Sequence, residues 1–136
     1  MCMGEYMQIE FTAFGFKYGI LTEADIVFDV RCLENPFYIS ALRDKTGEYK
    51  EVRDYIMSFP ETDEVLKRIR DYLEYTIPLY EKKGKERLVV AFGCTGGQHR
   101  SVTCAYVLRE YFAAQYPHIR MAMRDMDRNQ KDIAGK

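Results

Sequence analysis

Three observations predict an α/β domain built as three layers around a mainly parallel sheet. The run Leu88–Phe92 is apolar at every position, as is typical of a parallel strand that helices cover on both faces. After Asp63 the apolar residues recur at helical spacing, with charged residues between them, at Val65, Leu66, Ile69, Leu73 and Ile77. The expected elements follow one another in the order β, β, α, β, α, β, which is typical of a three-layer α/β fold.

The N-terminal part of the chain is predicted to form two strands and a loop. Ile9–Phe16 is rich in aromatic and β-branched residues, and Ile26–Val30 is a short apolar run that we expect to be largely buried. A loop is expected at Leu33–Pro36, because a proline disfavours helix at the residue before it. Thr46 and Gly47 indicate a further turn.

The periodic apolar residues predict the first helix. It is expected to begin at Thr62 or Asp63, either of which is a suitable N-cap. Pro78 is expected to kink or end the helix, because proline lacks the N–H that a helix interior needs. Gly84 is expected to close the segment.

Two elements are expected after the apolar strand. A second helix is predicted from about Gln98 to Ala114, with Val102, Ala105, Tyr106 and Leu108 against the core. A short last strand is predicted near Ile119–Met123.

Length and composition predict one cytoplasmic domain over residues 1–136. Twenty basic residues against 21 acidic ones give a net charge of −1, so no global attraction to nucleic acid or to an anionic membrane is expected. The four cysteines form no C-x-x-C pair and indicate free thiols in a reducing compartment, and no metal site is expected. No apolar run approaches the roughly 20 residues of a membrane span, and no signal peptide is recognisable.

The segment Gly93–Ser101 has the composition of an anion-binding loop between a strand and a helix. Gly96 and Gly97 allow a tight turn in which several backbone N–H groups converge on one point. The free N–H groups of the following helix add to them, and the Arg100 guanidinium can hold two phosphate oxygens. Hydroxyl or imidazole donors come from Thr95, His99 and Ser101. We therefore expect this loop to bind a phosphorylated small molecule.

The same segment fits the Cys-x5-Arg-Ser pattern of cysteine phosphatases. A helix N-terminus and Arg100 would lower the pKa of Cys94 and make its thiolate a nucleophile. The alternative is that Cys94 is a small buried residue at the end of a strand, and two features favour it. Gly93 stands where those phosphatases usually carry histidine, and the general acid has only Asp29 and Asp125 as candidates.

Three further polar residues are candidates for accessory roles at the loop. Asp29 and Arg31 alternate with apolar residues at the end of a strand, so both could point toward the loop or simply pair with each other. Asn35 lies in the following loop. In the aromatic-basic run Phe14–Tyr18, we expect the phenylalanines to pack in the core and Lys17 to face solvent.

Several short motifs occur in an order and spacing that resemble the C-terminal domain of the RapZ (YvcJ) family, from about Phe11 to Arg128. They are Phe14–Gly19, Ala24-Asp25, Phe28–Arg31, Asn35-Pro36, Thr46-Gly47 and Gly93–Ser101. The resemblance implies a fold similar to a phosphofructokinase subdomain, self-association into a homo-oligomer, and a regulatory role without a cofactor. It also implies ligand contacts at Thr95, Gly96, His99 and Arg100. A further family contact follows the Asn-Pro pair, where some members carry histidine and this chain has Phe37. Full-length family members carry an N-terminal P-loop domain; no G-x-x-x-x-G-K-[ST] sequence occurs here, so we expect a stand-alone domain and no ATP or GTP binding.

The best-known members of the family present small RNAs to a ribonuclease and sense an amino-sugar phosphate. The resemblance therefore implies the same classes of partner, a small RNA and a ribonuclease or another protein. The candidate RNA contacts are Lys17, Arg124, Arg128 and Lys131. Asp125, Asp127 and Asp132 dilute the positive charge of the C-terminal region, so weak, salt-sensitive RNA binding is expected.

Three functions remain open from the sequence. The first is a non-catalytic regulator that binds a phosphorylated small molecule, with RNA or a protein as its downstream partner. The second is a phosphatase that uses Cys94 and Arg100. The third is a protein-interaction module in which the anion loop is not used.

Overall fold

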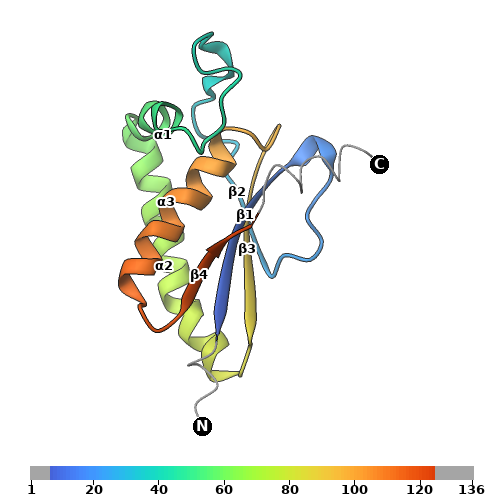
Figure 1. Ribbon diagram of the computed structural model, residues 1–136, viewed down its shortest axis with the longest axis vertical. Coiled ribbons are helices and arrows are strands. Elements are labelled where there is room, and N and C mark those ends of the chain that lie inside the picture. Colours follow the sequence, from blue (N-terminus) through green and yellow to red (C-terminus); the bar gives the residue numbers. More distant parts are fainter. Residues whose placement is uncertain (1–6, 125–136) are drawn as a thin grey trace.

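The computed structural model describes residues 7–124, and its centre is a parallel sheet (Figure 1). The four strands are β1 (Gln8–Gly15), β2 (Ile26–Asp29), β3 (Arg87–Cys94) and β4 (Arg120–Met123). Their order across the sheet is β2-β3-β1-β4, and every pair of neighbours is parallel. The carboxyl ends of β1, β2 and β3 therefore meet at one edge, where the loop 94–101 begins.

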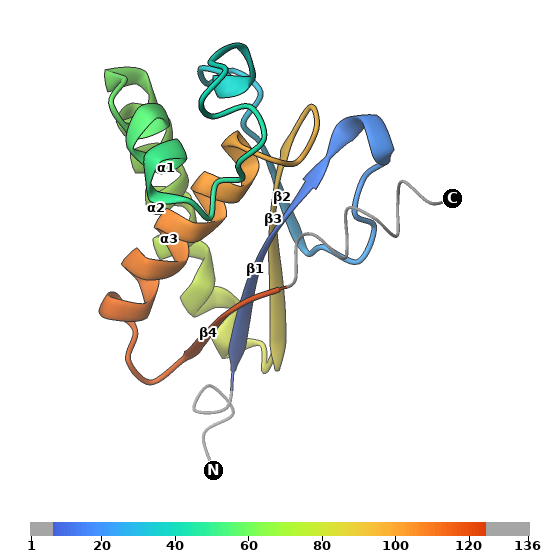
Figure 2. The same ribbon diagram turned by 45° about the horizontal axis from the view of Figure 1, so that its top comes forward.

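Three helices cover one face of this sheet, as both ribbon views show (Figures 1 and 2). They are α1 (Lys50–Met57), α2 (Pro60–Lys82) and α3 (Arg100–Gln115). The steps from β2 to β3 and from β3 to β4 run in the same direction along the sheet, so right-handed crossovers place their helices on the same face. The connection from β1 to β2, residues 16–25, steps in the opposite direction and runs over the other face (Figures 1 and 2).

These observations confirm the predicted α/β fold with its parallel sheet and are consistent with three layers. In detail, the layer on the second face is irregular chain with one 3-10 helix, Phe16–Tyr18, where the apolar strand suggested helices on both faces. The main core lies between the sheet and the helices. It is formed chiefly by Ile9, Phe11 and Ala13 of β1, Leu88, Val90 and Phe92 of β3, Leu66, Leu73 and Ile77 of α2, and Leu108 and Phe112 of α3.

Helix α2 differs from the sequence prediction at both ends. It begins at Pro60, a residue suited to the first helical turn, so neither Thr62 nor Asp63 is its N-cap. Thr62 is instead buried, and its hydroxyl donates to the Ile56 carbonyl at 2.7 Å. Pro78 does not end the helix, which continues to Lys82 while Leu73 and Ile77 stay fully buried. Burial of this face outweighs the hydrogen bond that the proline removes.

The other elements follow the prediction to within a few residues, except that α1 was not predicted. β1 and β2 end one residue earlier than expected, β3 continues through Cys94, and α3 begins at Arg100, two residues later than expected. α1 rests on a small second core formed by Leu42, Val52 and Ile56. Among residues 7–124, no helix is long and apolar enough to cross a membrane.

Candidate anion-binding site

The predicted loop forms one wall of an open cavity of about 270 Å³. The lining residues come from three places, namely the turn after β1, the 3-10 helix Pro36–Tyr38 with the residue before it, and the loop itself. They are Lys17, Tyr18, Asn35, Phe37, Tyr38, Cys94, Thr95, Gly96, Gln98, His99 and Arg100. Within the described part of the chain, this lining contains two cationic side chains and no carboxylate, so its charge favours an anion.

The glycines give the loop its path, but not in the way that the sequence suggested. Gly97 has a φ of 72°, which disfavours other residues, whereas Gly96 does not have positive φ. A Cβ on Gly96 would meet only the Lys17 Cε atom, at 4.0 Å. The close approach involves Gly15 at the end of β1, because a Cβ there would lie 2.6 Å from the Gly96 carbonyl carbon. No pattern in the sequence connects Gly15 with the loop.

Arg100 is buried and links the anion loop to the segment after β2. Its Nη1 donates to the carbonyl oxygens of Arg31, at 2.7 Å, and Leu33, at 3.2 Å. Its Nη2 lies 3.4 Å from the Thr95 hydroxyl, and its Nε is buried without a hydrogen-bond partner among the described residues. Nη1 of Arg100 therefore joins α3 to the segment after β2, and Nη2 is directed toward Thr95 in the cavity wall.

His99 is neutral and faces a neighbouring loop. Its Nε2 lies 3.2 Å from the carbonyl oxygens of both Leu42 and Arg43, and since carbonyls only accept, Nε2 carries the proton. Burial lowers the pKa of His99 below its ordinary value, and the nearby Arg100 charge acts in the same direction. His99 therefore fixes the loop position more than it supplies charge, although it does line the cavity.

The lowered pKa of His99 makes stability depend on pH. The unfolded chain binds a proton at about pH 6.5, whereas the native state resists protonation, so stability falls as pH drops below that value. In the wild type, His99 adds a slope of at most about 1.4 kcal/mol per pH unit to the free energy of unfolding between pH 7.5 and 5.5. We expect His99→Gln to remove this slope, as measured by urea unfolding at several pH values. His118→Gln is the matched control, because His118 is the other histidine of the chain and is exposed. Equal slopes in the wild type and His99→Gln would contradict the assignment of a neutral His99.

Cys94 and Ser101 bind each other at the back of the loop. The Cys94 thiol lies 3.1 Å from the Ser101 hydroxyl, and the Ser101 N–H donates to the sulfur at 3.4 Å. Both residues are buried, and Ser101 is not part of the cavity lining. Ser101 therefore supports Cys94 rather than contacting a ligand directly.

Of the three candidates for accessory roles at the loop, Asp29 and Arg31 pair with each other, and Asn35 lines the cavity. Asp29 and Arg31 form an ion pair at 2.7 Å, and hydrogen bonds from Arg31 hold the pKa of Asp29 below its ordinary value. Neither side chain lines the cavity; the Arg31 guanidinium lies 4.0 Å from the centre of the Phe16 ring. Asn35 does line it, and its Oδ1 accepts the Phe37 N–H at 3.0 Å. Asn35 thus shapes the 3-10 helix that faces the loop.

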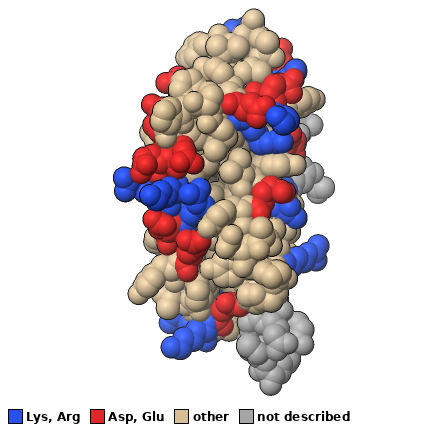
Figure 3. Space-filling model, turned by 90° about the vertical axis from the view of Figure 1, so that its left-hand side faces the viewer, with Lys and Arg blue, Asp and Glu red and all other residues tan. Residues whose placement is uncertain are grey.

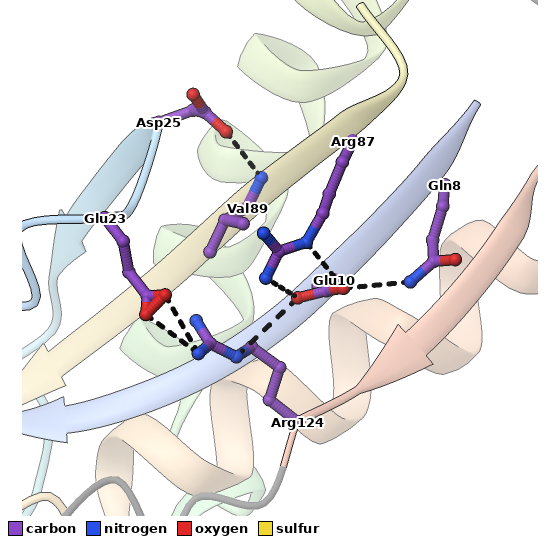
Figure 4. Close-up of polar contacts among 7 residues, drawn as sticks. All are labelled: Gln8, Glu10, Glu23, Asp25, Arg87, Val89 and Arg124. Carbon is purple, nitrogen blue, oxygen red and sulfur yellow. Dashed lines mark hydrogen bonds and ion pairs between the residues drawn. The ribbon is translucent and has the colours of Figure 1, made fainter.

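The four candidate RNA contacts lie in different parts of the chain, and the structure describes two of them, Lys17 and Arg124. Lys17 is exposed as expected; it also lines the cavity, and its N–H donates to the Thr95 carbonyl at 3.2 Å. Arg124 is paired with Glu23 at 2.8 Å and with Glu10 at 3.6 Å on the sheet face opposite the helices (Figure 4). Candidates Arg128 and Lys131, and Asp125, lie outside the described residues.

Figure 4 also shows why Arg124 is held in place. Glu10 accepts two hydrogen bonds of 2.8 Å from Arg87, and these bonds are the main reason that the pKa of Glu10 lies below its ordinary value. Arg124 therefore joins an ion-pair network across β1 and β3 and is not a free positive charge.

A second loop, residues 42–47, supports the site and was not foreseen. The Gln98 amide donates to the carbonyls of Arg43, at 2.8 Å, and Lys45, at 3.1 Å. In return, the Gly47 N–H donates to the Gln98 carbonyl at 2.9 Å. A Cβ on Gly47 would lie 2.5 Å from the Thr103 nitrogen, so the Thr46-Gly47 turn packs directly on α3. Only the turn itself had a sequence signal.

Comparisons with known proteins find a matching family and several relatives. Residues 7–127 match the family described as RapZ C-terminal domain. The chain is 44% identical over 128 residues to the nucleotide-binding protein YvcJ of Bacillus subtilis, which is 94% of this chain and 43% of that protein. It is 47% identical over 119 residues to a nucleotide-binding protein of Geobacillus thermodenitrificans, covering 88% of this chain and 40% of that protein. The chain thus spans less than half the length of these relatives.

Proposed function

The chain belongs to the RapZ C-terminal domain family, and on this premise we propose that it is a regulatory domain that binds a phosphorylated small molecule at the loop 94–101. The observation that carries the proposal is the lining of the cavity, where Lys17 and Arg100 supply positive charge and no carboxylate of the described chain opposes them. A phosphomonoester dianion fits this balance of charge better than a neutral or cationic ligand.

Each part of the loop has a separate role in this proposal. The Thr95 hydroxyl and the Lys17 ammonium are exposed and can bind phosphate oxygens without rearrangement of the core. The N-terminus of α3 adds its dipole. Arg100 completes the cradle with the part of its guanidinium that faces Thr95. The family resemblance suggests that the ligand is of the amino-sugar phosphate type.

The ligand is proposed to be bound and not hydrolysed. The spacing of Cys94 and Arg100 suits a cysteine phosphatase, and the Ser101 contacts to the sulfur are compatible with one. Such an enzyme also needs an acid to protonate the leaving group. Asp29 is paired with Arg31 outside the cavity, and no other carboxylate in residues 7–124 lines it. The geometry therefore favours binding without turnover.

Downstream partners are proposed from the family and not from a charged surface. Figure 3 shows acidic and basic side chains interspersed on the helical side, with no broad area of positive charge. Arg124 is neutralised by Glu10 and Glu23. We propose a small RNA, with a ribonuclease or another protein, as the partner, together with self-association and a cytoplasmic location. Because Arg124 is paired and the face drawn in Figure 3 has no broad positive area, we expect RNA binding to be weak and salt-sensitive.

Lys17→Gln tests the ligand site without disturbing the core. We expect it to weaken binding of glucosamine 6-phosphate about five- to tenfold at low salt, because one charge-assisted contact to the phosphate is lost. Binding is measured as thermal stabilisation over a ligand titration, where ligand at 100 times its dissociation constant adds about 2.7 kcal/mol. Lys67→Gln is the control, since Lys67 is an exposed lysine of α2 outside the cavity.

Unphosphorylated glucosamine and inorganic phosphate complete the titration. Stabilisation by the phosphorylated sugar but not by glucosamine is expected. Equal affinities of Lys17→Gln and the wild type would place the ligand elsewhere. Absence of any stabilisation would favour a protein-interaction module, and release of inorganic phosphate would identify a phosphatase.

A further inference from the structure

Aromatic side chains line the cavity together with the phosphate-binding residues. Phe37 and Tyr38, here called the aromatic wall, lie in one 3-10 helix with their ring centres 5.5 Å apart, and Tyr18 of the turn after β1 also lines the cavity. Phe37 is 47% exposed and Tyr38 is 77% exposed, so their rings face solvent. Neither residue belongs to a core cluster of the described chain, and the fold therefore does not need their apolar surface.

The Phe37 side of this wall is held rigidly. The Asn35 side chain caps the 3-10 helix Pro36–Tyr38, and the Ile39 N–H closes it on the Pro36 carbonyl at 2.9 Å. Arg43 donates to the Phe37 carbonyl at 2.8 Å and places its guanidinium 5.2 Å from the centre of the Phe37 ring. Exposed aromatic rings that are fixed in this way are suited to stacking, because little conformational entropy is lost on binding.

The wall and the anion loop are also fixed relative to each other. Gln98 and His99 bind the carbonyls of the segment 42–45, which begins four residues after Tyr38 of the aromatic wall. Arg100 binds the carbonyls just before it. A ligand that reaches from the loop to the wall therefore meets two preorganised surfaces.

We propose that the cavity takes a nucleoside 5′-monophosphate, with its phosphate on the loop 94–101 and its base stacked on the aromatic wall. This inference rests on the proposed function, because a nucleoside monophosphate is a sugar phosphate that carries a base. The cavity of about 270 Å³ is slightly below the range of about 300–1,000 Å³ typical of ligand pockets, which suits a mononucleotide better than a dinucleotide. Stacking on aromatic side chains is tolerant of base identity, so purines and pyrimidines both bind.

The test compares AMP, ribose 5-phosphate, adenosine and inorganic phosphate by calorimetry and thermal stabilisation of the full chain. We expect AMP to bind about tenfold more tightly than ribose 5-phosphate, from the usual strength of base–aromatic stacking. Phe37→Leu, which keeps the bulk but removes the flat ring, is expected to lower the affinity for AMP to about that for ribose 5-phosphate. Tyr38→Ala is a second variant, at an exposed position where folding is not at risk.

Tyr75→Ala is the matched control, because Tyr75 is 74% exposed and lies on α2. Equal affinities for AMP and ribose 5-phosphate would overturn the inference and leave the proposed function standing. If none of the phosphorylated compounds binds, glucosamine 6-phosphate included, both fail. A 5′-phosphorylated oligonucleotide that binds more tightly than AMP would also overturn the assignment to a free nucleotide.

Discussion

Arg100→Ala is expected to lower both stability and ligand affinity, more than any other single change in the loop. Removing the guanidinium leaves the carbonyls of Arg31 and Leu33 without their donor and takes one charge from the cavity wall. We expect a loss of about 2–4 kcal/mol in the free energy of unfolding. The affinity for a phosphomonoester is expected to fall about a hundredfold. Urea unfolding and calorimetry measure the two effects separately.

Arg68→Ala is the control for this substitution. Arg68 is exposed on α2, and within residues 7–124 its ion pair is with Glu64 in the preceding turn of the helix, at 3.2 Å, so its loss is expected to cost less than about 0.5 kcal/mol. A stable Arg100→Ala protein that keeps its ligand affinity would show that Arg100 neither anchors the segment after β2 nor contacts the phosphate. A destabilised protein with unchanged affinity would retain only the anchoring role.

Gly15→Ala is expected to displace the anion loop although the substitution lies outside it. The added Cβ would lie 2.6 Å from the carbonyl carbon and 2.7 Å from the oxygen of Gly96, and 2.9 Å from the Gly97 nitrogen. All three are backbone atoms, so no side chain can rotate away. We expect a destabilisation of about 1–3 kcal/mol in urea unfolding. Phosphomonoester binding is expected to be lost, because the loop N–H groups no longer converge.

Gly96→Ala provides the comparison on the other side of this contact. Its Cβ would meet only the Lys17 side chain at 4.0 Å, and its backbone does not need positive φ. Its effect on stability is therefore expected to stay within about 0.5 kcal/mol. If Gly15→Ala were as stable as Gly96→Ala, the close packing of β1 against the loop would be refuted.

Local patterns predicted most of the fold but missed what depends on packing. The apolar periodicity placed α2, α3 and the strands to within a few residues, because burial of one face follows directly from the spacing. Helix α1 was missed, since its eight residues depend on contacts of Val52 and Ile56 with the distant Leu42. Pro78 was given too much weight, because the packing of Leu73 and Ile77 keeps the helix intact around it.

The candidate site was predicted as a list of residues and not as an arrangement. The cavity includes Thr95, Gly96, His99 and Arg100, all of which were expected, and Asn35 as an accessory residue. Lys17 was predicted as an RNA contact, and the structure adds that it lines the cavity. Phe37 stands at a position that the family resemblance marked, whereas Tyr38 had no signal, since an aromatic residue in a loop acquires meaning only when the chain brings it to the cavity beside the phosphate-binding segment.

The sequence by itself determined the fold class and the family of the chain, and it located the candidate anion loop. These depend on short-range features, namely periodicity, turn residues and the order of short motifs. Only the tertiary structure decided which polar group each loop residue binds. Arg100 meets carbonyls 67 and 69 residues away, and Gln98 meets one 55 residues away. Such partners are backbone atoms, which every residue carries, so no side-chain pattern in the sequence marks them.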